Sequence, residues 1–174
     1  PLGISHGAGG IGLAFLELFR VTGETRYLDP AVEAVRYEES RFDPEHQSWP
    51  DLRHRPLASY IEEGRLDQLR TDLADGTFDV ADAAPGHMNA WCHGAPGIGL
   101  VRARFVELLD EGYGAALRRC AEQTLPSLAD PRMRPRSHSL CHGLLGNAEA
   151  LLHMAQVLGE FGLGDERYAR AAFE

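Results

Sequence analysis

The stretch "CHGAPGIGLVRARFVEL", residues 92–108, begins with a cysteine and a histidine and continues with apolar residues at helical spacing. The same order recurs in "SHGAGGIGLAFLEL", residues 5–18, and in "CHGLLGNAEALLHMA", residues 141–155. In each copy a Ser or Cys is followed by His, Gly, two further residues and a second Gly. Such self-similarity predicts a repeat architecture in which every copy starts the same structural element.

The repeated positions include a histidine and a pair of glycines. His6, His93 and His142 coincide when the copies are aligned, and so do the glycine pairs Gly7/Gly10, Gly94/Gly97 and Gly143/Gly146. Glycines at fixed offsets from a helix start are explained most simply by close backbone approach where helices converge. Capture of an anion at the helix N-termini is a second interpretation of the same pattern.

Two further amphipathic stretches separate the motifs. They are "RYLDPAVEAVRYEESRF" (26–42), with Pro30 suited to a first helical turn, and "YGAALRRCAEQTL" (113–125), in which Cys120 is expected to be a small core residue. Strand-like alternation is scarce, so the chain is predicted to be all-α and built of helical hairpins. Residues 43–56 and 72–87 are rich in Pro, Gly and Asp and are expected to be surface connections or site walls.

Composition narrows the class of protein. A chain of 174 residues can form one domain with its own core, and a net charge of −9 argues against unaided binding to nucleic acid or anionic membranes. No apolar run approaches the length of a membrane span. Three widely spaced cysteines indicate reduced thiols in a cytoplasmic protein. Because the chain starts without Met inside a motif-like stretch, residues 1–174 are expected to be part of a longer protein.

Cys92, Cys141 and His142 form a candidate metal site. Two sulfurs and one nitrogen suit zinc, and three protein ligands leave the fourth position open, as in catalytic sites. Two thiolates cancel the metal charge, so such a site is better at holding a third, nucleophilic thiolate than at generating hydroxide. A free thiol is only about 3% ionised at pH 7, and full ionisation by the metal removes a handicap of roughly 2 kcal/mol.

Alternative interpretations remain open for these residues. The two cysteines could be buried apolar residues, or His93 could complete a closed structural zinc site as a fourth ligand. His6 follows Ser5 in place of a cysteine, so it could line the same cavity and transfer protons, or only form hydrogen bonds at a helix start. Trp91 could be a core aromatic or a wall that keeps water from the metal.

Taken together, the motifs "GISHGAGGIGLA" (3–14), "AWCHGAPGIGL" (90–100) and "HSLCHGLLGN" (138–147) resemble those of the lanthionine synthetase C-like cyclases. The chain is most similar to the C-terminal cyclase domain of bifunctional lanthipeptide synthetases, which the stretch "RYEESRFDP…SWPDLR" also resembles. The resemblance implies an α/α toroid, of which residues 1–174 would form the C-terminal half. Leu144 departs from the acidic residue expected in the third motif.

The resemblance also implies a reaction and a set of residues. The reaction is zinc-dependent addition of peptide Cys thiols to dehydroalanine or dehydrobutyrine, which forms thioether rings. The implied partners are a dehydrated precursor peptide and an upstream dehydratase region of the same polypeptide. The implied site contains one zinc per chain on Cys92, Cys141 and His142, the catalytic residue His6, and a substrate pocket with Trp91 and His93.

Two other functions compete with this one. A related zinc protein could bind glutathione or thiol peptides without forming rings. An α/α-barrel glycosidase would share the helical ring but should use paired carboxylates, and none clusters at the repeated helix starts.

Overall fold

The computed structural model describes residues 1–52, 60, 64–77, 86–109, 111–133, 135 and 137–173. Helices are the regular secondary structure of these residues, and the β contacts found among them are isolated bridges. The prediction of an all-α fold is therefore confirmed. No helix in this described part of the chain has both the length and the apolar character needed to cross a bilayer.

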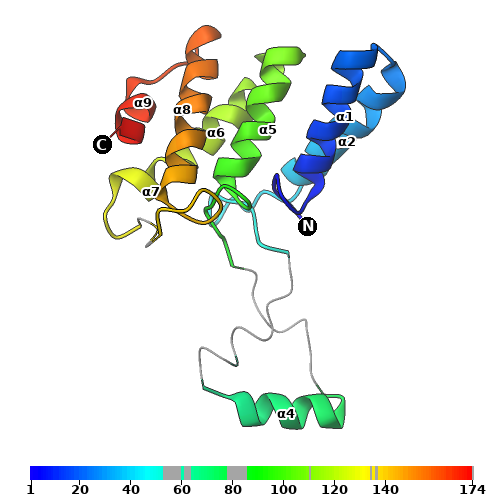
Figure 1. Ribbon diagram of the computed structural model, residues 1–174, viewed down its shortest axis with the longest axis vertical. Coiled ribbons are helices and arrows are strands. Elements are labelled where there is room, and N and C mark those ends of the chain that lie inside the picture. The colour runs from blue at the N-terminus through cyan, green and yellow to red at the C-terminus, as the bar shows by residue number, and fades with distance from the viewer. Residues whose placement is uncertain are drawn as a thin grey trace.

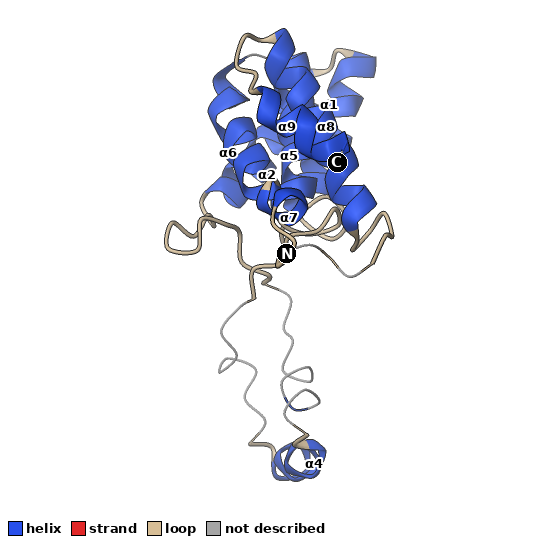
Figure 2. Ribbon diagram, turned by 90° about the vertical axis from the view of Figure 1, so that its left-hand side faces the viewer, coloured by secondary structure: helices blue, strands red, loops and turns tan. Residues whose placement is uncertain are grey.

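Among the described residues, three helical hairpins form the helical body (Figure 1). The first pairs α1 (Ala8–Thr22) with α2 (Leu28–Glu39), the second α5 (Ala95–Leu108) with α6 (Gly114–Thr124), and the third α8 (Leu144–Glu160) with α9 (Glu166–Phe173). Helices α1, α5 and α8 lie side by side in that order, with α2 and α6 behind them (Figure 2). This arc of hairpins is consistent with part of an α/α toroid.

Further helical elements lie either between the two helices of a hairpin or between successive hairpins. These are η1 (Thr25–Tyr27), α4 (Leu66–Asp75), η2 (Glu111–Tyr113) and α7 (Pro126–Ala129). Helix α4 corrects the prediction of a loop over residues 72–87, because it continues to Asp75 and ends at Gly76, which adopts a left-handed conformation. Residues 53–56 and 78–85 of the two predicted loops lie outside the described residues.

Helix α5 is the centre of the fold because it is buried on two sides. One apolar cluster joins it to α6, α8 and α9 and includes Ile98, Leu117, Leu151 and Tyr168. A second cluster joins it to α1 and α2 and includes Leu16, Ala31, Val35, Val101 and Phe105. A helix that is apolar on most sides belongs in the interior, where each fully buried large side chain contributes about 1.5–3 kcal/mol. This burial holds the N-terminus of α5, and the motif before it, in a fixed place.

A buried ion pair ties the first two hairpins together. The Arg102 guanidinium lies 3.2 Å from a Glu38 carboxylate oxygen, and both side chains are fully buried. The other Glu38 oxygen accepts a hydrogen bond of 2.6 Å from the backbone N–H of Gly3, in the loop before α1. Arg102 also donates to the carbonyl of Val35. The pair thus links α2, α5 and the first motif.

Replacing Arg102 with Met should destabilise the protein strongly, because the Glu38 carboxylate would stay buried without a cationic partner. The expected loss is about 3–5 kcal/mol of unfolding free energy, or about 6–20 °C in Tm. Urea unfolding followed by circular dichroism measures it. Arg132→Met is the control, since Arg132 pairs with Asp130 at the surface, where solvent screens the pair, and its loss should leave the unfolding free energy nearly unchanged. Equal losses of unfolding free energy in the two variants would contradict the stabilising role of the Arg102–Glu38 pair.

Candidate metal centre

The second glycine of each motif lets its loop lie directly against the first turn of the following helix. A Cβ added to Gly10 or Gly97 would come within 2.0 Å of a loop carbonyl oxygen, that of Ile4 or Trp91 respectively. At Gly146 the corresponding distance, to the Leu140 oxygen, is 1.7 Å. No other residue fits at such positions. The predicted explanation by close backbone approach is therefore confirmed.

The three motif loops are joined to one another by their backbones. The N–H of Ser5 donates to the carbonyl of Cys92 at 3.4 Å, and the N–H of Cys92 donates to the carbonyl of Cys141 at 3.3 Å. Ser5, Cys92 and Cys141 occupy the same position in their respective repeats. Equivalent residues of the three repeats are therefore hydrogen-bonded to one another, and Cys92 lies in the middle of the three loops.

This arrangement brings the three predicted metal ligands together. The Cys92 Sγ lies 3.3 Å from the His142 Nε2, and the Cys141 Sγ lies 4.0 Å from the same nitrogen. All three donor atoms lie within 4.8 Å of one another. Cys92 is fully buried, Cys141 is half-buried and His142 is exposed, so the group opens toward solvent on one side.

The donor set fits a zinc ion in chemistry and in spacing. In a tetrahedral site with Zn–S bonds of about 2.3 Å and Zn–N bonds of about 2.0–2.1 Å, a sulfur and a nitrogen lie about 3.6 Å apart and two sulfurs about 3.8 Å apart. The observed sulfur–nitrogen distances of 3.3 and 4.0 Å lie on either side of the first value. Small side-chain movements therefore suffice to bind an ion.

The third cysteine does not belong to this group. Cys120 lies in α6 and is fully buried in the main apolar cluster, as the sequence predicts. Burial raises the pKa of its thiol to about 12, so it remains protonated at neutral pH. A permanently protonated, enclosed thiol is a packing group and not a metal ligand.

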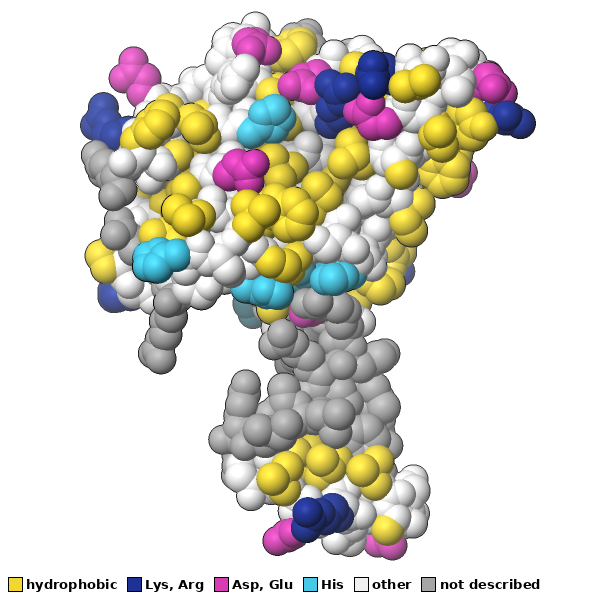
Figure 3. Space-filling model, viewed as in Figure 1, with side chains coloured by type: hydrophobic (Ala, Val, Ile, Leu, Met, Phe, Trp, Pro, Cys, Tyr) yellow, Lys and Arg dark blue, Asp and Glu magenta, His cyan; other side chains and the backbone are white. Residues whose placement is uncertain are grey.

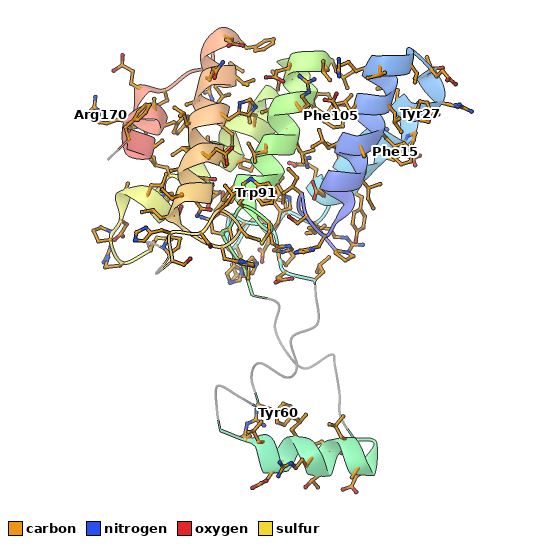
Figure 4. All side chains as sticks on the ribbon, viewed as in Figure 1. Phe15, Tyr27, Tyr60, Trp91, Phe105 and Arg170 are labelled. Carbon is orange, nitrogen blue, oxygen red and sulfur yellow. The ribbon has the colours of Figure 1, made fainter. Side chains whose placement is uncertain are left out.

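Trp91 directly precedes Cys92 in the chain, and the loop that carries His6 is bonded to Cys92 through its backbone. His6 is exposed and follows Ser5, whose backbone N–H donates to Cys92. Trp91 is half-buried where the loops before α5 and α8 meet, with its Cβ beside Gly146 (Figure 4). Histidine side chains gather along this end of the helical body, below the apolar face of α1, α5 and α8 (Figure 3).

His93 is fully buried. Its donor atoms lie outside the metal-ligand group, which argues against the interpretation of His93 as a fourth ligand, and its place at the substrate pocket stays a prediction. Its Nε2 lies 3.6 Å from an oxygen of Asp51, which is 5% exposed. His93 therefore contacts Asp51 in the protein interior and connects the second motif to the loop after α2.

Asp51 is a residue that sequence reasoning missed. It belongs to the distinctive stretch "SWPDLR" (48–53), for which no role follows from the pattern alone. In the structure Trp49 of this stretch is fully buried and donates from its indole nitrogen to the carbonyl of Glu38 at 3.1 Å. The anchored tryptophan places Asp51 against His93, next to Cys92.

Comparison with known families agrees with this geometry. The family model described as lanthionine synthetase C-like protein matches residues 1–169, nearly the whole chain. The chain belongs to the lanthionine synthetase C-like family. Within this lanthionine synthetase C-like fold, Leu144 is the first residue of α8 and packs against the main apolar cluster near Leu128. Its neighbours there are apolar, so the departure from the expected acidic residue is matched by packing and not by an ion pair.

Proposed function

We propose that this chain carries the ring-forming centre of a zinc-dependent lanthipeptide cyclase. In the reaction a peptide cysteine sulfur forms a bond to the β-carbon of dehydroalanine or dehydrobutyrine, and a proton is added to the α-carbon. The product is lanthionine or methyllanthionine, and no oxidant or reductant is needed. The convergence of Cys92, Cys141 and His142 in a chain of this family is the observation that supports the proposal.

Cys92, Cys141 and His142 would hold one zinc ion, whose chemistry when bound is to ionise the substrate thiol at the remaining coordination position. The chain keeps these ligands in place through its backbone. Cys92 is hydrogen-bonded on both sides, to Ser5 and to Cys141, and its side chain has no exposed surface. The half-buried Cys141 and the exposed His142 leave the open side free for a peptide thiol.

His6 is the candidate for proton transfer in this mechanism. Its side chain is exposed, it follows Ser5, whose backbone N–H bonds to Cys92, and it lies outside the metal-ligand group. It would help deprotonate the incoming thiol or protonate the enolate that forms when sulfur adds to the double bond. Trp91 would exclude water from one wall of the same site.

The substrate of this reaction is a dehydrated precursor peptide. We expect a dehydratase region of the same polypeptide to supply it, as in the bifunctional synthetases that the motifs resemble. Because free substrate thiols are required, the reaction belongs in the reducing cytoplasm.

Ring formation on a dehydrated peptide that contains a free cysteine tests the proposal. Addition leaves the peptide mass unchanged, so it is measured as loss of thiol alkylation together with resistance of the ring to fragmentation. Rings should form with zinc-loaded protein and stop after chelation. Ring formation at an unchanged rate in metal-free protein would overturn the proposal, as would tight glutathione binding without any turnover of the dehydrated peptide.

A further inference from the structure

A second group of metal-binding side chains lies outside the centre described above. Asp43 and His46 belong to the loop after α2, and His87 belongs to the segment that leads into the second motif. The His46 Nδ1 lies 2.7 Å from Asp43 Oδ2, and the His87 Nε2 lies 3.0 Å from the same oxygen. One donor atom from each residue lies within 4.8 Å of the other two.

Asp43 is held in place by its own loop. Its backbone N–H and carbonyl pair with Ser48 at 2.8 and 3.2 Å. Its Oδ1 accepts the backbone N–H groups of Glu45 and His46, at 2.9 and 3.3 Å. The other oxygen, Oδ2, is thereby directed at the two imidazoles. The hydrogen bond from His46 lowers the pKa of the Asp43 carboxyl to about 2, so the group is a carboxylate at neutral pH.

The two imidazoles approach this oxygen as a stacked pair. Their ring centroids are 4.1 Å apart and the ring planes differ by 15°. Two imidazole nitrogens thus converge on one carboxylate oxygen, and a bound metal ion would displace the protons that now bridge them.

We propose that Asp43, His46 and His87 bind a second divalent transition-metal ion such as zinc, with water completing its coordination. Two imidazole nitrogens and one carboxylate oxygen are a ligand set typical of zinc and iron(II), whereas calcium and magnesium prefer oxygen alone. Nitrogen and oxygen ligands of a tetrahedral zinc are about 3.3 Å apart, so the hydrogen-bonded pairs now at 2.7 and 3.0 Å would have to separate by a few tenths of an ångström around an ion. The side chains are 29%, 55% and 17% exposed for Asp43, His46 and His87, so ions and water can reach them.

The ion would join two chain segments that flank the catalytic centre. Residues 43–51 end at Asp51, which is bonded through its N–H to the carbonyl of Gly86 at 2.7 Å and faces His93. His87 lies on the other segment, five residues before Cys92. A metal at this point would hold the segment that precedes Cys92 against the loop after α2. This site is independent of the proposed cyclase activity, since it shares no ligand with the sulfur-containing centre.

Metal stoichiometry measured on the purified, chelator-stripped and reconstituted protein tests this site. With zinc we expect two ions per chain in the wild type and one in His87→Gln. Glutamine can still donate a hydrogen bond to Asp43 but is a poor ligand for zinc, so a purely structural hydrogen bond would be preserved. His138→Ala, at an exposed histidine outside both groups, is the matched control and should retain two.

Cobalt substitution assigns each ion to its site. The sulfur-to-cobalt charge-transfer absorption should persist in His87→Gln and disappear in Cys92→Ala, and each variant should lose one ion. Saturating zinc should raise the Tm of Cys92→Ala by about 5–10 °C at a hundredfold excess over the dissociation constant, because only the second site remains. Equal stoichiometry in wild type and His87→Gln would overturn the proposal. If the wild type showed no charge-transfer band but still bound one ion more than His87→Gln, only the assignment of the sulfur-containing centre would be contradicted.

Discussion

Cys92→Ala should abolish zinc binding at the sulfur-containing centre and lower ring formation by at least about 10³-fold. Loss of thiol ionisation alone accounts for about 30-fold, since a free thiol is only about 3% ionised at pH 7. The remainder comes from lost positioning of the sulfur against the double bond. The backbone hydrogen bonds of Cys92 to Ser5 and Cys141 do not involve its side chain, so the loop should keep its shape. Cobalt absorption and a thiol-alkylation assay measure the two effects.

The matched control for this variant is Cys120→Ala. Cys120 is equally buried but lies in α6, away from the metal-ligand group. Its loss should reduce stability through packing and leave both cobalt absorption and ring formation in place. If Cys92→Ala kept its thiolate–cobalt band, or if Cys120→Ala lost it, the assignment of the ligands would be wrong.

His6→Ala should lower the rate of ring formation by about 10²–10⁴-fold while the metal content stays unchanged. The reason is that His6 lies outside the metal-ligand group, so its removal takes away proton transfer but no ligand. Rate measurements at saturating peptide, together with metal analysis of the same sample, check both parts. Added imidazole should restore part of the rate, which a purely structural role would not predict.

His138→Ala serves as the comparison for His6→Ala, because His138 is also an exposed histidine, lies within the third motif and is not a predicted ligand. It should retain the wild-type rate. A His6 variant that formed rings at full speed would remove this residue from the mechanism. One that lost zinc would show that His6 supports the ligands instead of transferring protons.

Helix positions are the part of this protein that could be predicted well from sequence. Each Gly-containing motif predicts a helix start, and α1, α5 and α8 begin at Ala8, Ala95 and Leu144, within their motifs. Pro30 lies in the first turn of α2, as its ring geometry favours. These features depend on neighbouring residues and on the 3.6-residue period, so they can be inferred without knowledge of the tertiary structure.

The buried residues of the loop after α2 could not be predicted in this way. Its Pro- and Asp-rich composition predicts a surface connection, and its His46 is indeed exposed. Trp49 and Asp51 of the same loop are instead buried, against the carbonyl of Glu38 and the imidazole of His93. These partners are 11 and 42 residues away along the chain, at distances for which a local pattern carries no information.

The sequence by itself determined the all-helical class, the repeated helix starts and the identity of the sulfur and imidazole donors. The tertiary structure brings the predicted ligands Cys92 and His142 together, and it alone showed that His93 turns inward to Asp51. It alone also grouped Asp43 and His46 with His87. The physical reason is that helix starts depend on local backbone geometry. Contacts between distant residues depend on how the hairpins stack around α5, and that stacking is set by the whole apolar core.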